Sequence, residues 1–91
     1  MRYVIAYDIS DDDRRTRLAH LLEGHGRRVQ YSVFECQLGE RELLRLRRDM
    51  LRVIDPSTDS IRIYGLCGRC RAALEVLGTG PVGGFDRVQV I

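Results

Sequence analysis

The sequence predicts an α+β fold of the ferredoxin-like type, in which one antiparallel sheet carries both helices on one face. Two observations lead to this prediction. Strand-like and helix-like segments follow one another in the order strand, helix, strand, strand, helix, strand, and the first strand is apolar on both faces. A chain of 91 residues forms one domain with a modest core, so we also expect a homodimer that pairs through the uncovered face of the sheet.

The first predicted strand covers residues 3–10 and ends close to a carboxylate, Asp8. Successive side chains of a strand alternate between its faces, which gives the sets Tyr3, Ile5, Tyr7 and Ile9, and Val4, Ala6 and Asp8. Because both sets are largely apolar, both faces require cover. The helices cover one face, and a second copy of the chain is the simplest cover for the other. A two-fold axis would then bring two copies of Asp8 toward each other. On a mostly apolar face we expect this charge to need a metal, a cation or another partner; the alternative is that Asp8 only caps the next turn.

A helix is expected from Ser10 to about His25. Ser10 and Asp13 have a spacing that resembles a capping box, and negative charge in a first turn is stabilised by the helix dipole. One face is apolar at helical spacing: Leu18, Leu21, Leu22 and His25. Neither histidine of the chain is well placed in the sequence for an acid–base role.

Arginine supplies every one of the 15 basic residues, and the net charge is +2. Arg14, Arg15 and Arg17 follow Asp8 within the next nine positions, which suits a site that holds a phosphate backbone beside a carboxylate. Two alternatives stay open. Base composition or adaptation to heat could have replaced lysine throughout, and Arg14 could pair with the neighbouring aspartates.

Two strands, Arg28–Tyr31 and Ser32–Leu38, are expected next, and then a helix from Gly39 and Glu40 to about Ile54. The second helix has an apolar stripe made of Leu43, Leu46, Met50, Val53 and Ile54. Opposite that stripe lies a row of arginines: Arg41, Arg45, Arg48 and Arg52. This row either tracks a nucleic-acid backbone or forms a solvated face partnered by Glu42 and Asp49.

The last third of the chain begins with an alternating strand, residues 61–66. Cys67 and Cys70 form a CxxC motif that we expect to lead into a short helix through Val76. Structural cysteines are the preferred interpretation; a four-cysteine zinc site across a dimer and a redox motif are the alternatives. We divide the chain into a ferredoxin-like domain (1–78), a glycine-rich link (79–84) and a terminal strand (85–91), which pairs with the dimer mate or a partner.

No run of about 20 apolar residues occurs, and the sequence does not open like a signal peptide. We therefore expect a soluble, cytoplasmic protein that does not engage a membrane.

Three stretches carry a resemblance to a known family. They are YDIS at 7–10, VQYSVFE at 29–35 and IRIYGL at 61–66, and they resemble the small CRISPR-associated adaptation protein of the Cas-two (Cas2) family along essentially the whole chain. The resemblance implies a homodimer that partners the Cas-one (Cas1) integrase in spacer acquisition and antiviral defence. It also implies a magnesium-dependent nuclease acting on RNA or DNA, with endoribonuclease preferred. Asp8 matches the family's metal-binding aspartate, and further matches to the nuclease site or its support are Tyr7, Arg15, Arg17, Arg28 and Phe34.

This resemblance suggests a specific chemistry. Mg²⁺ prefers oxygen ligands and keeps several waters, so one Asp8 from each subunit and a substrate phosphate can hold it. Arg15, Arg17 or Arg28 would orient the substrate backbone, and no dedicated general base is visible. A non-catalytic adaptor that holds DNA for the integrase and a toxin-like ribonuclease on the same scaffold are the alternative functions.

Overall fold

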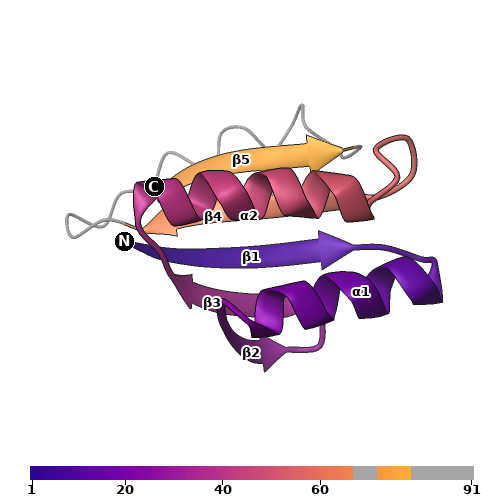
Figure 1. Cartoon of the computed structure of the whole chain (residues 1–91), viewed down its shortest axis with the longest axis horizontal. Coiled ribbons are helices and arrows are strands. Elements are labelled where there is room, and N and C mark those ends of the chain that lie inside the picture. Colours follow the sequence, from indigo (N-terminus) through magenta and orange to yellow (C-terminus); the bar gives the residue numbers. More distant parts are fainter. Residues whose placement is uncertain (67–71, 79–91) are drawn as a thin grey trace.

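The computed structural model describes residues 1–66 and 72–78. In this part of the chain, two helices and five strands follow one another as shown in Figure 1. Their order is β1 (Arg2–Asp8), α1 (Asp12–Glu23), β2 (Gly26–Gln30), β3 (Val33–Gln37), α2 (Glu40–Val53), β4 (Ser60–Leu66) and β5 (Ala72–Gly78). The first six elements confirm the predicted order.

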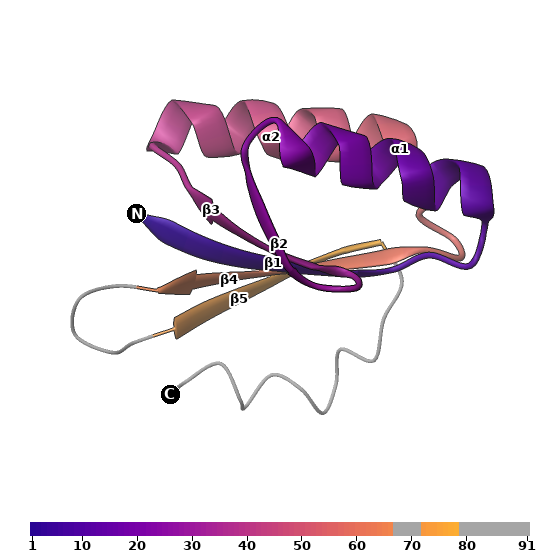
Figure 2. The same cartoon turned by 90° about the horizontal axis from the view of Figure 1, so that it is seen from below.

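The strands form one sheet in the order β2-β3-β1-β4-β5. All neighbouring strands are antiparallel. Both helices lie on one face of this sheet, as the edge-on view in Figure 2 shows. The predicted ferredoxin-like α+β fold is therefore confirmed. We call the face away from the helices the open face.

Alternation along β1 decides which side chains meet the helices. Ile5 and Tyr7 are buried in the core, while Val4 and Ala6 are half-buried on the open face and Asp8 is exposed there. The helices contribute apolar side chains to the same core, with Leu18 and Leu22 from α1 and Leu46 and Met50 from α2 fully buried. The predicted split of β1 into two faces is thus confirmed.

The ends of α1 differ from the prediction. Asp11, and not Ser10, is the N-cap, since its side chain accepts a hydrogen bond of 3.0 Å from the backbone N–H of Arg14. The helix ends at Glu23, so His25 lies beyond it. The start differs because the Asp11 carboxylate reaches a free N–H of the first turn. The end differs because the sequence after Glu23 is rich in glycine.

The prediction of a short helix after the CxxC motif is wrong, because Ala72–Gly78 forms strand β5. This strand pairs with β4 along its whole length, from Ser60 opposite Gly78 to Leu66 opposite Ala72. Pairing satisfies the backbone groups that β4 would otherwise expose at an edge. Glu75 of β5 also forms an ion pair with Arg47 of α2, so the helix and the strand are joined by side chains.

Three predictions fall outside the described residues. These are the CxxC motif itself, the glycine-rich link at 79–84 and the terminal strand at 85–91. Within the described part, neither helix has the length and apolar character needed to cross a membrane.

Candidate active site

Asp8 stands at the end of β1 on the open face, where its carboxylate is exposed. Cross-strand pairing places it opposite Ser60, and the two line a shallow hollow of about 100 Å³ together with Ala6, Tyr7 and Arg62. No hydrogen bond or ion pair to the Asp8 side chain occurs within residues 1–66 and 72–78. The carboxylate is exposed in this single copy, and the need of Asp8 for a metal, a cation or another partner stays a prediction. The carboxylate is free to bind a ligand.

The described residues of a single copy do not form a complete set of metal ligands. Among the described residues, no group of three or more His, Cys, Asp or Glu side chains could hold a metal ion. The chemistry of Asp8 nevertheless fits Mg²⁺, which binds hard oxygen ligands and completes its shell with water and substrate phosphate. Among the residues that line the hollow, Asp8 is the only carboxylate.

Tyr7 points from the same strand to the opposite side, into the helix-covered face. Its ring packs against Phe34 of β3, with the centroids 6.3 Å apart and the planes at 27°. Arg28 of β2 lies over the other aromatic ring, with its guanidinium carbon 5.3 Å from the Phe34 centroid. Burial raises the pKa of the Tyr7 hydroxyl, and the neighbouring Arg28 opposes that rise.

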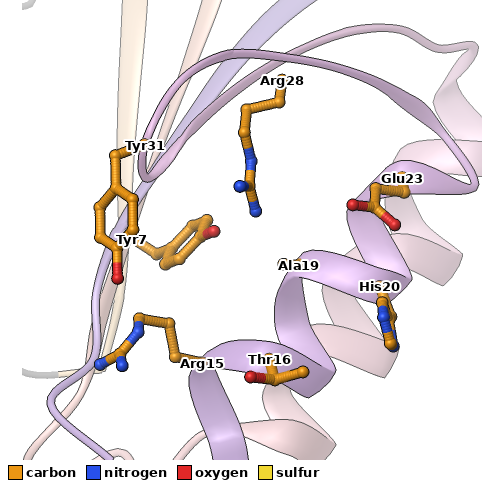
Figure 3. Close-up of a pocket in the computed structure, with 8 residues that line it drawn as sticks. All are labelled: Tyr7, Arg15, Thr16, Ala19, His20, Glu23, Arg28 and Tyr31. Atoms are coloured by element: carbon orange, nitrogen blue, oxygen red, sulfur yellow. The ribbon is translucent and has the colours of Figure 1, made fainter. Parts of the chain in front are cut away.

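These residues border a pocket of about 270 Å³ between α1 and the β2–β3 turn, shown in Figure 3. Its lining consists of Tyr7, Arg15, Thr16, Ala19, His20, Glu23, Arg28 and Tyr31. Arg28 and Arg15 lie on either side of Tyr7 in this view. Arg28 makes no ion pair within the described residues, so its guanidinium group makes the pocket suitable for a phosphate or another anion.

Arg15 is fixed in place by the turn that follows β1. Its Nη1 donates to the carbonyl oxygens of Ile9 at 3.0 Å and Ser10 at 3.4 Å, and its Nη2 pairs with the carboxylate of Asp12. Arg15 therefore connects the end of β1, where Asp8 lies, with the pocket. Arg17 is exposed on α1, and no ion pair to it occurs in the described part of the chain.

Arg14 has a different environment from the other arginines of α1. Its Nε and Nη2 donate to the two carboxylate oxygens of Asp59, at 2.7 Å and 3.2 Å. Asp59 is completely buried, and its carboxylate also accepts the backbone N–H of Asp55 at 2.8 Å. The hydrogen bonds from Arg14 hold the pKa of Asp59 below its ordinary value. We assign this pair to the fold and leave Arg14 out of the proposed nucleic-acid surface.

The structure brings four of the predicted site residues together, namely Tyr7, Arg15, Arg28 and Phe34. It places the side chain of Asp8 on the other face of the sheet. Sequence reasoning missed Asp59 and Arg62. Arg62 could have been found from its strand, because Arg62 and Asp8 share the open face of an alternating sheet, whereas nothing local distinguishes Asp59 from the acids around it.

Known proteins of similar sequence identify the family to which this chain belongs. Residues 1–73 match the model of the family described as CRISPR associated protein Cas2. The chain belongs to the Cas2 family. It is 51% identical to the CRISPR-associated endonuclease Cas2 2 of Thermus thermophilus, over 98% of this chain and 94% of that protein. It is 50% identical to the CRISPR-associated endoribonuclease Cas2 1 of Chloroflexus aurantiacus, over 89% of this chain and 88% of the relative.

Solved structures agree with the Cas2 assignment. A hypothetical protein from Thermus thermophilus superposes with a TM-score of 0.72 at 52% identity, covering 89% of this chain and 94% of its own. The Cas2 protein of Streptococcus pyogenes gives a TM-score of 0.70 at 35% identity, with 74% and 87% covered. The family prediction is confirmed, and the prediction of a CRISPR-associated nuclease agrees with the names of these Cas2 relatives.

Proposed function

We propose that this Cas2 protein is a magnesium-dependent endonuclease, with RNA preferred over DNA, that works as a homodimer in the cytoplasm. The observation that supports this proposal most strongly is the exposed carboxylate of Asp8, which has no partner in residues 1–66 and 72–78. In the cell we propose Cas1 as its partner in spacer acquisition and antiviral defence, as membership of the family implies.

The open face supports the proposed dimer. Several apolar side chains lie half-buried across strands β3, β1, β4 and β5 of this face: Val4, Ala6, Val33, Tyr64 and Val76. A second copy packed here by a two-fold axis would cover this stripe and bring two Asp8 carboxylates together at one end of it. Residues 85–91 are proposed to pair with the mate or with a partner's sheet edge.

The proposed chemistry uses few residues. A bound Mg²⁺ would supply Lewis-acid activation of water and of the scissile phosphate. The two Asp8 side chains would hold the ion through their oxygens. Arg28 would bind a phosphate of the strand in the pocket, and Arg15 would keep the turn after β1 in position. The nucleic-acid strand would then run from the pocket past Ile9 and Ser10 to the two Asp8 side chains. Because none of the described side chains near Asp8 is poised as a general base, we expect slow turnover.

The test is cleavage of end-labelled single-stranded RNA and of duplex DNA by the purified protein, with Mg²⁺ or with EDTA. We expect RNA cleavage that needs the metal and returns when excess Mg²⁺ is added back. Cleavage of duplex DNA alone would support nuclease activity, with DNA in place of RNA as the substrate. Failure to cut either substrate, together with salt-dependent binding of duplex DNA, would overturn the nuclease and favour the DNA-holding adaptor.

Arg28→Ala provides a prediction for the pocket. We expect binding of single-stranded RNA to weaken by about tenfold, and the slope of log K against log salt to fall by about 0.7, because one phosphate contact is lost. Fluorescence anisotropy at several salt concentrations measures both quantities.

Arg27→Ala is the matched control for Arg28→Ala. Arg27 is the neighbouring arginine of β2, but it lies on the open face. Its Nη2 donates to Glu35 Oε1 at 3.4 Å. An equal loss of affinity in both variants would show that general charge, and not the pocket, binds RNA.

A further inference from the structure

The outer face of α2 contains an internal repeat that the proposed nuclease does not use. Residues 41–45 read RELLR and residues 48–52 read RDMLR, so the same pattern recurs after seven positions. In each unit the third residue faces the core, as Leu43 and Met50, and the fourth residue is Leu44 or Leu51. A heptad spacing returns a side chain to nearly the same face of a helix, about 10 Å along its axis.

Both leucines of the repeat point outward. Leu44 is 59% exposed and Leu51 is 44% exposed, and the arginines beside them, Arg41, Arg45, Arg48 and Arg52, are exposed as well. An isolated exposed leucine is common on protein surfaces, but two in register on one helix face are the pattern by which amphipathic helices pack together. Neither leucine belongs to the core formed by the described residues, so the repeat is available to a binding partner.

The charges beside the leucines are mostly unneutralised. No ion pair to Arg41, Arg45 or Arg52 occurs within the described residues. Arg48 forms an ion pair with Asp49, with 3.4 Å between its Nε and Asp49 Oδ1. The Glu42 carboxylate accepts the backbone N–H of Gly39 at 2.8 Å, so it caps the helix. The expected solvated face partnered by Glu42 and Asp49 is therefore present only at Asp49.

We propose that this surface, formed by Leu44, Leu51 and the four arginines, docks an acidic amphipathic helix of a partner protein. The partner would place apolar side chains one heptad apart on the two leucines and carboxylates opposite the arginines. The leucines decide between a protein and a nucleic acid: a phosphate backbone would use the arginines alone, and exposed leucines would add nothing to its binding. This surface lies on the helix layer and is separate from Asp8 on the open face.

A designed peptide tests the proposal. The probe is a fluorescein-labelled helix of about 20 residues with leucine every seventh position and glutamates flanking each leucine, and the second peptide has the same composition in scrambled order. Fluorescence anisotropy at moderate salt measures binding to the full chain. We expect the ordered peptide to bind at least about tenfold more tightly, equivalent to about 1.4 kcal/mol, because only it presents leucines and carboxylates on one face.

Variants separate the leucines from the arginines. Two double variants are expected to weaken binding of the ordered peptide by about tenfold each. One is Leu44→Ser with Leu51→Ser, and the other is Arg45→Glu with Arg52→Glu. Val29→Ser removes a similarly exposed apolar side chain from β2 and is expected to leave binding unchanged. RNA cleavage by the leucine variant should equal that of the parent protein, so the docking surface and the nuclease are tested independently. Thermal unfolding checks that each variant is folded.

Three outcomes would overturn the docking surface. Equal binding of ordered and scrambled peptides would show attraction by charge alone. A leucine variant that binds like the parent would remove the apolar anchors from the interaction. Loss of duplex DNA binding in the arginine variant, with peptide binding unchanged in both variants, would identify the surface as a phosphate-binding one.

Discussion

Asp8→Asn is expected to slow cleavage of single-stranded RNA by at least about a hundredfold while RNA binding changes by less than about twofold. The amide keeps the size of the carboxylate and removes the charge that would hold Mg²⁺. Because the Asp8 side chain is exposed and makes no hydrogen bond or ion pair in the described part of the chain, the free energy of unfolding should change by less than about 0.5 kcal/mol. Cleavage of end-labelled RNA with saturating Mg²⁺ measures the rate, and anisotropy measures the binding.

Asp13→Asn is the matched control for this variant. Asp13 is also an exposed aspartate without an ion pair in residues 1–66 and 72–78, but it lies in the first turn of α1. We expect this variant to cleave at the parent rate. Light scattering on all three proteins should give the same dimer mass, which excludes loss of assembly as the cause. Undiminished cleavage by Asp8→Asn would show that the activity has another origin.

Asp59→Ala is expected to lower the free energy of unfolding by about 3 kcal/mol, measured by urea denaturation. The substitution removes a completely buried carboxylate that joins α1 to the loop before β4 through Arg14 and that accepts the Asp55 backbone N–H. Those donors would lose their acceptor at a part-buried position, where the side chain of Arg14 is only 28% exposed. Nuclease activity per folded molecule should remain, since Asp59 does not line the hollow around Asp8.

The same ion pair predicts a pH dependence. Arg14 holds the pKa of Asp59 below its ordinary value of about 3.9, so the pair's contribution to stability is complete above that pH and is lost as the pH falls through the lower pKa of the folded state. Asp59→Asn should therefore flatten, but not abolish, the fall in stability in acid. Part of the slope remains because hydrogen bonds from Ser57 also lower the pKa of Asp55. An unchanged acid slope, or a loss of unfolding free energy no larger than that of Asp13→Asn in the first turn of α1, would contradict this assignment.

Local periodicity made much of the fold predictable. The alternation of β1 placed Tyr7 and Asp8 on opposite faces, and the stripe of α2 placed Leu46 and Met50 in the core, as the structure confirms. Such patterns depend only on the 2.0- and 3.6-residue periods of the two backbone conformations. The candidate metal-binding aspartate could likewise be identified from its motif and from the strand that carries it.

Other features depend on contacts between distant parts of the chain. Ala72–Gly78 is a strand because the edge of β4 is there to receive it, which no short window of sequence records. Arg14 and Asp59 are 45 positions apart, so the sequence could only offer nearer aspartates as partners for that arginine. Gathering Tyr7, Arg15 and Arg28 around one pocket likewise requires β1, α1 and β2 to pack together.

By itself, then, the sequence determined the order of the first six elements, the faces of β1 and α2, and the family, because these follow from local spacing and motif. Only the tertiary structure decided that Arg14 belongs to the fold and Arg28 to a pocket, and that Asp8 stands apart from both. It also showed that Leu44 and Leu51 are left exposed. Those outcomes depend on which distant segments compete for the same guanidinium group, sheet edge or apolar surface, and that competition is resolved only when the chain packs.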